Sequence, residues 1–168
     1  MIQPAPTKLI WKRQPNSHHC FVCGLESEVG LKLRFDDNGV DEVRSHITLN
    51  RKYQGYPGVA HGGIIAAMLD EIGGRVTMSA NPDRFMMTAK LDLKFRKPVP
   101  VDTPLTLIGK LLRDRGRLVE AHCEICLPDG SVAAEAEVVL AQIPANYSPG
   151  ADLDDLGWRV YPDGDSAS

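Results

Sequence analysis

Alternating apolar and polar positions run through most of residues 31–143, and this two-residue period predicts β-strands. The clearest example is 88–97, where Leu91, Leu93 and Phe95 alternate with charged residues until Pro98 ends the run. Further strands are predicted over 31–36, 43–49, 105–112, 118–127 and 132–140. The segments DNG, RDRGR and PDGS between them are typical of tight turns, so neighbouring strands are expected to form antiparallel hairpins.

A single long segment, 61–78, has the period of a helix instead. Its large apolar residues recur at steps of three and four, and alanines fill the opposite side: Ile64, Ile65, Met68, Leu69, Ile72, Val76, Ala66, Ala67. A helix that is apolar nearly all round is expected to be buried. One central helix among antiparallel strands predicts an α+β fold.

The two ends of the chain lack this patterning. Residues 1–19 are expected to form an irregular N-terminal arm. Residues 144–168, rich in Pro, Gly and Asp, are expected to form a C-terminal tail that packs loosely or is disordered. The whole chain has 168 residues, of which 43% are hydrophobic. The patterned part between the two ends therefore suits a single domain.

Charge and composition exclude several classes of function. Nineteen Lys and Arg against 22 Asp and Glu give a net charge of −3, which does not favour nucleic acid as a partner. No apolar run approaches the ~18 residues needed to span a bilayer, so no membrane span is expected. The Pro-rich N-terminus does not resemble a secretory signal. A cytoplasmic protein with reduced thiols is therefore expected.

Asp70 is a charged residue in the middle of the apolar helix. A buried carboxylate without a partner costs several kcal/mol, so it must be paired, solvated or used in chemistry. Either Asp70 faces water together with Glu71, or it belongs to a site. At the start of the helix, His61-Gly62-Gly63 places glycine amides at the positive end of the helix dipole. This suits an oxyanion hole, although a Gly-Gly entry also serves as a flexible helix start.

The spacing of these two features has a consequence for assembly. Asp70 follows His61 by nine residues, or ~13 Å along a helix axis. One helix cannot easily bring both to the same atom. If both act on one substrate, two helices must meet, which predicts a dimer with its site at the interface.

The segment HGGIIAAMLDE, preceded by YQGYPGVA and followed by TAKLDLKFRKPVP, closely resembles hotdog-fold acyl-coenzyme A thioesterases. Within them it resembles the phenylacetic-acid-type and mammalian thioesterase-superfamily groups. The resemblance runs from about Cys20 to Ala141 and includes CFVCG and GLKLRF near the start. It implies a hotdog domain over 20–143, with an antiparallel sheet wrapped around one long helix. It also implies hydrolysis of acyl-CoA to free acid and CoA, by a dimer or a dimer of dimers. No cofactor is expected.

The resemblance also implies roles for single residues. Asp70 corresponds to the general base or nucleophile, the amide of Gly63 is directed at the carbonyl oxygen, and His61 helps to position that oxygen. Thr88 corresponds to a residue that orients the attacking water, or is an ordinary strand threonine. Glu71 is expected beside the site or at the interface. Because a thiol leaving group has a pKa of about 8.5, it departs without a strong general acid, so one carboxylate and an oxyanion hole suffice.

Other residues are candidates for binding the substrate. Gly62 allows a ligand to approach the backbone closely, and Tyr56 is placed to line an acyl pocket or to pack locally. Arg96, Lys97 and Arg115 lie near predicted strand ends, where they can meet the phosphates of CoA or remain solvated turn charges.

Two C-x-x-C units raise the question of a zinc site. Cys123 and Cys126 lie in a predicted strand, where residues three apart point to opposite faces, so apolar packing is expected and no metal. A non-catalytic acyl-CoA-binding protein is the alternative function. A hotdog hydratase would need a paired Asp and His in one strand-to-helix motif, which the sequence does not contain.

Overall fold

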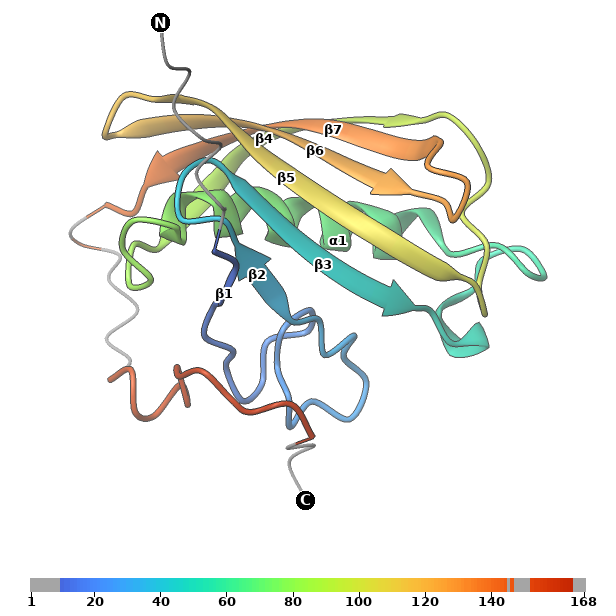
Figure 1. Cartoon of the computed structure of the whole chain (residues 1–168), viewed down its shortest axis with the longest axis horizontal. Coiled ribbons are helices and arrows are strands. Elements are labelled where there is room, and N and C mark those ends of the chain that lie inside the picture. Colours follow the sequence, from blue (N-terminus) through green and yellow to red (C-terminus); the bar gives the residue numbers. More distant parts are fainter. Residues whose placement is uncertain (1–9, 145, 147–151, 165–168) are drawn as a thin grey trace, which may run out of the picture.

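The computed structural model describes residues 10–144, 146 and 152–164. Parts of the expected irregular ends, residues 1–9, 145, 147–151 and 165–168, lie outside the described residues. Short 3-10 helices occupy Arg51–Tyr53 and Val76–Met78. The strands and the helix are β1 Lys12–Arg13, β2 Phe35–Asp37, β3 Glu42–Thr48, α1 Gly62–Arg75, β4 Met86–Phe95, β5 Pro104–Asp114, β6 Leu118–Cys126 and β7 Val132–Gln142 (Figure 1).

The strands form one antiparallel sheet in the order β1-β2-β3-β5-β6-β7-β4, and the sheet curves over α1 (Figure 1). The predicted hairpins β5–β6 and β6–β7 are confirmed as neighbours, with Gly109 opposite Cys123 and Cys123 opposite Ala136. The predicted α+β class with a single long helix is likewise confirmed. Among the described strands, β4 pairs with β7 alone and forms one edge of the sheet.

Helix α1 presents one apolar side to the sheet. Ile65, Met68, Leu69 and Ile72 are buried there, and each contributes about 1.5–3 kcal/mol by leaving water. The other side is half-exposed in the single chain, along the line of Ile64, Ala66, Ala67 and Asp70. The expectation that the helix is buried on all sides is therefore wrong for one chain alone.

The predicted strand over 31–36 is mostly absent. Only its last residues enter the sheet, as β2, because Lys32 has a φ of 55°, which interrupts extended backbone. The amides of Leu31 and Leu33 instead donate to the carbonyls of Phe21 and Val22, at 2.9 and 2.8 Å. This segment is therefore bound to the CFVC turn rather than to β3.

The described parts of the two ends pack side by side below the helix (Figure 1). Asn16 pairs with Arg159 in an antiparallel bridge, and the amide of His18 donates to the carbonyl of Leu156 at 2.9 Å. Residues 152–164 are irregular but anchored: Tyr161 is buried. Among the described residues, no helix combines the length and the apolar character that crossing a bilayer requires.

Candidate active site

Asp70 and Thr88 form a hydrogen-bonded pair between α1 and the edge strand β4. The Thr88 hydroxyl donates to Oδ1 of Asp70 at 2.6 Å, a short, charge-assisted hydrogen bond. Within the described part of the chain, the second oxygen of Asp70 accepts no hydrogen bond from protein. The carboxylate is thus fixed at one oxygen and free at the other.

A β-bulge places Thr88 on the helix side of the sheet. Thr88 pairs with Leu140 and Lys90 pairs with the adjacent Val139, so Ala89 is an extra residue in β4. In a regular strand, residues an odd number of positions apart point to opposite faces. The extra residue shifts this alternation by one, so Thr88 and Leu91 point to the same face of the sheet. A regular strand with Leu91 inside would have turned Thr88 away from Asp70.

The pair opens into a cavity of about 280 Å³. Polar groups of Asp70, Glu71 and Thr88 line one part of it. The rest is formed by α1 and the segment after it, by β4 and β7, and by the two chain ends: Gly74, Arg75, Met78, Phe85, Met86, Leu140, Ser17, Cys20, Cys23, Leu156 and Trp158. The site is therefore assembled from segments far apart in the sequence.

Glu71 is held by a buried arginine. The guanidinium of Arg75, only 1% exposed, donates from Nε to Oε1 of Glu71 at 3.0 Å and from Nη1 to the carbonyl of Pro15 at 2.6 Å. It also lies over the rings of Phe35 and Trp158, at 4.5 and 5.0 Å from their centroids. Glu71 thus joins the helix to the chain ends that form the cavity wall.

At the other end of α1, His61 caps the helix. Its Nδ1 accepts the amide N–H of Gly63 at 2.9 Å, so the neutral ring carries its proton on Nε2. The N–H of Gly62, the first of the helix, has no acceptor among the described residues. In the HGG segment, the amide of Gly62 is therefore without an acceptor among the described residues, and the amide of Gly63 is bound to the side chain of His61.

A second cavity, of about 400 Å³, lies at this end of the helix. It brings together four predicted site residues, Tyr56, Gly62, Arg96 and Lys97, with the ring of Phe95 and with Val59, Ala60, Ile65, Pro98 and Val99. Arg96 is exposed and forms an ion pair with Glu135 at 2.6 Å.

Arg115 lies away from these residues. It lines neither of the two cavities. It sits in the β5–β6 turn, beside the end of β7, whereas Arg96 bonds to the start of β7 through Ala133. The two arginines are therefore at opposite ends of the sheet.

The two groups of predicted residues do not meet within one chain. Asp70 and Thr88 line the first cavity, while Gly62 lines the second. Asp70 follows Gly63 by seven positions, which corresponds to about 10 Å along the helix.

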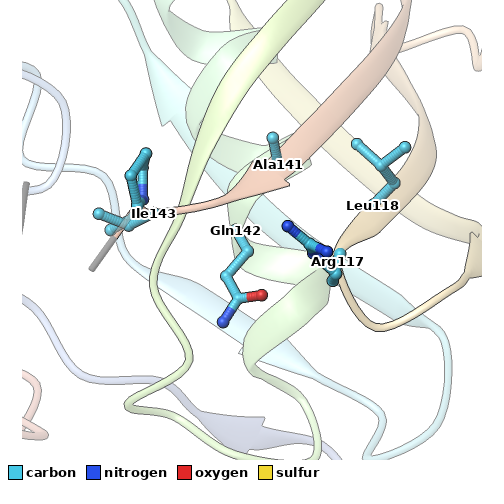
Figure 2. A pocket seen from close by; sticks show the side chains of 6 residues that line it. Arg117, Leu118, Ala141, Gln142 and Ile143 are labelled. Atoms are coloured by element: carbon cyan, nitrogen blue, oxygen red, sulfur yellow. The ribbon is translucent and has the colours of Figure 1, made fainter. Parts of the chain in front are cut away.

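A larger cavity, of about 780 Å³, lies where β6 begins and β7 ends. Figure 2 shows five residues of its lining: Arg117 and Leu118 at the start of β6, and Ala141, Gln142 and Ile143 at the end of β7. None of the described residues that line it carries a carboxylate, thiol or hydroxyl group, so its volume alone does not make it a site for bond cleavage.

Among the residues that the structure describes, three groups of side chains have the chemistry of metal ligands, each with ligand atoms within 4.8 Å of one another. They are His18 with His19 and Glu26, Cys20 with Cys23 and Glu71, and His122 with Glu124 and Glu135. Cys123 and Cys126 are part of none of them. Burial raises the pKa of the Cys123 thiol, as suits packing in the core.

Sequence reasoning missed the cavity residues that come from the chain ends and the loop before β4. Cys20, Phe85 and Trp158 carry no local pattern that links them to Asp70. The signal that the sequence does contain is Trp158, a large aromatic residue in a polar tail. Such a side chain stabilises the fold by packing against the domain, which indicates that this part of the tail contacts it.

Comparison with known proteins supports the hotdog interpretation. Residues 57–134 match the model of the thioesterase superfamily. A structure described as RHA08564, a thioesterase superfamily protein, superposes with a TM-score of 0.66 and 33% identity, over 74% of this chain and 61% of that one. These matches confirm the resemblance to hotdog-fold thioesterases that the HGG segment indicated.

Two further similar proteins have names or descriptions that mention acyl-CoA or acetyl CoA. The acyl-coenzyme A thioesterase THEM4 of Bos taurus is 28% identical over 119 residues, which cover 70% of this chain and 48% of that protein. The smu.793 protein of Streptococcus mutans, solved bound to acetyl CoA, has the same fold, with a TM-score of 0.55 and 21% identity over 60% of this chain and 79% of that one. The chain spans about half the length of the bovine relative.

Proposed function

We propose that this protein hydrolyses acyl-CoA thioesters at a site formed by two copies of the chain. The observation that carries the proposal is the Asp70–Thr88 pair on a cavity wall, with its second carboxylate oxygen free. The matches to thioesterases, named above, support the reaction class.

Asp70 acts on the attacking water in this proposal. The Thr88 hydroxyl holds Oδ1, which leaves Oδ2 to accept a proton from water as that water attacks the thioester carbonyl. The tetrahedral intermediate then expels the CoA thiolate, a leaving group that needs no strong acid. Asp70 thereby serves as general base and Thr88 as the group that orients it.

The HGG segment supplies the oxyanion hole. The Gly62 amide is free, and the Gly63 amide becomes free when the substrate oxygen replaces Nδ1 of His61. Both lie at the positive end of α1, where negative charge on oxygen is favoured.

A two-fold dimer brings the Asp70–Thr88 pair of one chain to the HGG segment of the other. The half-exposed apolar side of α1 and the unpaired edge of β4 are the surfaces that a second copy can cover. An antiparallel arrangement of the two α1 helices places the HGG segment of one chain near Asp70 of the other. Two equivalent sites result.

The basic residues beside the HGG segment are the proposed contacts for CoA. Lys97 and Arg96 are exposed at the mouth of the cavity that contains Gly62, and a phosphate can compete with Glu135 for Arg96. Tyr56, 83% exposed in the single chain, is available to cover the bound substrate.

Thiol release from a panel of acyl-CoA substrates tests the reaction. Asp70→Asn is expected to lower kcat by about 10²–10⁴, the usual contribution of a general base, while Asp92→Asn, on the exposed part of β4, keeps wild-type activity. Retention of full activity by Asp70→Asn would refute the role of Asp70. Binding of acyl-CoA without any thiol release by the wild type would favour the non-catalytic alternative.

Complementation tests the shared site. Gly63→Pro removes an amide in the first helical turn, where proline is tolerated, and should be inactive, as should Asp70→Asn. When the two variants are refolded together, half of the dimers are mixed and each has one intact site, so about a quarter of wild-type activity returns. A mixture with no more activity than its components would exclude a site built from two chains.

A further inference from the structure

The CFVC turn is the feature that the proposed reaction leaves unused. Cys20 and Cys23 both line the cavity that contains Asp70, and their sulfur atoms lie within 4.8 Å of each other. Cys20 is partly exposed, whereas Cys23 is 3% exposed. Both are free thiols.

The backbone is closed tightly around Cys20. The amide of Gly24 donates to the carbonyl of Cys20 at 2.8 Å, which forms one helical turn and brings residues three apart to the same side. A Cβ atom at Gly24 would lie 2.4 Å from that carbonyl oxygen, so the turn requires glycine. The amides of Val22 and Cys23 both point at the sulfur of Cys20, at 3.3 and 3.4 Å.

This environment makes the two thiols unequal. The hydrogen bond from the Cys23 thiol, helped by the two amides, lowers the pKa of Cys20 to about 7, even though burial and the charge of Glu71 oppose it. The same hydrogen bond, together with burial, raises the pKa of Cys23. Near neutral pH Cys20 is therefore more readily deprotonated to the reactive thiolate than an ordinary cysteine, while Cys23 stays a thiol beside it.

A metal ion is a less suitable occupant. Glu71, the third potential ligand, is already bound to the buried guanidinium of Arg75 through Oε1, at 3.0 Å. Arg75 places a positive charge against the position that a cation would take, and none of the described residues joins Cys20, Cys23 and Glu71 as a fourth ligand.

We propose that Cys20 and Cys23 form a peroxide-sensitive pair that closes into a reversible disulfide. The Cys20 thiolate attacks hydrogen peroxide; the O–O bond breaks, hydroxide leaves and takes up a proton, and Cys20 becomes a sulfenic acid. The sulfur of Cys23 then attacks that of Cys20, the S–O bond breaks, and the proton of Cys23 leaves with hydroxide as water. Two thiols are oxidised and one peroxide is reduced to two waters.

The second C-x-x-C unit provides an internal comparison. Cys123 and Cys126 have the same spacing but lie in β6, where Cys123 faces the core and Cys126 the opposite side. Their sulfurs cannot meet without breaking the strand, so this unit is expected not to form a disulfide.

Peroxide treatment followed by peptide mass spectrometry tests the proposal on the full chain. Trypsin separates the units, since residues 14–32 contain only Cys20 and Cys23, and residues 118–159 only Cys123 and Cys126. After peroxide, alkylation in denaturant should fail at both cysteines of the first peptide, which loses two hydrogen atoms, and dithiothreitol should restore both sites. The second peptide should be alkylated fully.

Variants identify the attacking sulfur without any reference to thioester hydrolysis. Cys23→Ser should stop at a Cys20 sulfenic acid that dimedone traps, Cys20→Ser should leave Cys23 reduced, and Cys126→Ser should behave as wild type. Equal alkylation of all four cysteines after peroxide, or a disulfide between chains, would overturn the proposal. So would one equivalent of zinc bound to the reduced protein and lost in Cys20→Ser.

Discussion

Two adjacent glycines of α1 give opposite predictions for the same substitution. Gly73 faces the sheet: a Cβ atom there would meet three atoms of Val138 at 2.9, 3.1 and 3.1 Å. Gly74, the next residue, has nothing within 4 Å of its Cβ position. Gly73→Ala and Gly74→Ala therefore make the same chemical change in the same helix with different surroundings.

The expected magnitudes follow from two opposing terms. Alanine is favoured over glycine inside a helix by about 1 kcal/mol, so Gly74→Ala should stabilise the protein by about that amount. In Gly73→Ala the same gain is offset by overpacking, which costs about 1–3 kcal/mol. The two variants should therefore differ by about 1–3 kcal/mol, or about 2–12 °C in Tm for a chain of this length.

Thermal unfolding followed by circular dichroism measures this difference. Both variants and the wild type must be compared at one protein concentration, because association makes Tm depend on concentration. The order of Tm should be Gly74→Ala, then wild type, then Gly73→Ala at or below wild type. If the Tm of both variants rises equally, Gly73 does not lie as close to Val138 of β7 as the structure indicates, and the explanation from packing fails.

Three further outcomes are expected. Thr88→Val removes a hydrogen bond to a charged acceptor, worth about 1.5–3 kcal/mol, so kcat should fall about ten- to a hundredfold, whereas Thr88→Ser should stay within a few-fold; equal effects would show that the bond to Asp70 is not used. The hydrogen bond from Arg84 lowers the pKa of Asp114 to about 2. The Arg84–Asp114 pair is partly exposed, so it should stabilise the fold by less than about 1 kcal/mol. This stabilisation is present above pH about 4 and is lost as the pH falls towards 2. Urea titrations should show Arg84→Gln less stable than wild type at pH 7 by a margin that narrows as the pH falls towards 2, where only the hydrogen bond from Arg84 to the carbonyl of Gly116 remains to be lost; a margin that does not change with pH would contradict the assignment. Because Trp158 is only half-buried, Trp158→Ala should cost less than the roughly 3–5 kcal/mol of a tryptophan in the core; it should also shift kcat/KM towards larger acyl groups, and an unchanged preference would mean that the indole does not limit the cavity.

The sequence predicts the sheet, the helix and the hairpins because these depend on local periodicity. It also predicts that Asp70 and the HGG segment lie too far apart for one chain, since the rise of a helix is fixed. The position of Thr88 could not be predicted in this way. Alternation from Leu91 puts Thr88 on the outer face, and only the extra residue Ala89 turns it towards Asp70.

Non-local contacts explain the other differences. The strand predicted from Leu31 fails because Lys32 adopts positive φ and the amides on either side bond to the CFVC turn. The alternation of apolar and polar residues in 31–36 does not indicate that this segment binds the CFVC turn. Likewise, Trp158 reaches the cavity only because the tail pairs with the N-terminal segment at Asn16.

The cavity beside Asp70 divides between two parts of the chain. Asp70 and Thr88 lie within residues 57–134, the part that matches the superfamily model, whereas Cys20, Leu156 and Trp158 lie outside it. In the proposed function, exchanging the chain ends would therefore keep Asp70 and Thr88 and replace many of the residues that line the cavity taken to hold the acyl group. Under the proposed function, the groups that act on the thioester and much of the wall that contacts the acyl group come from different parts of the chain, so the chain ends are the place to engineer a new substrate preference.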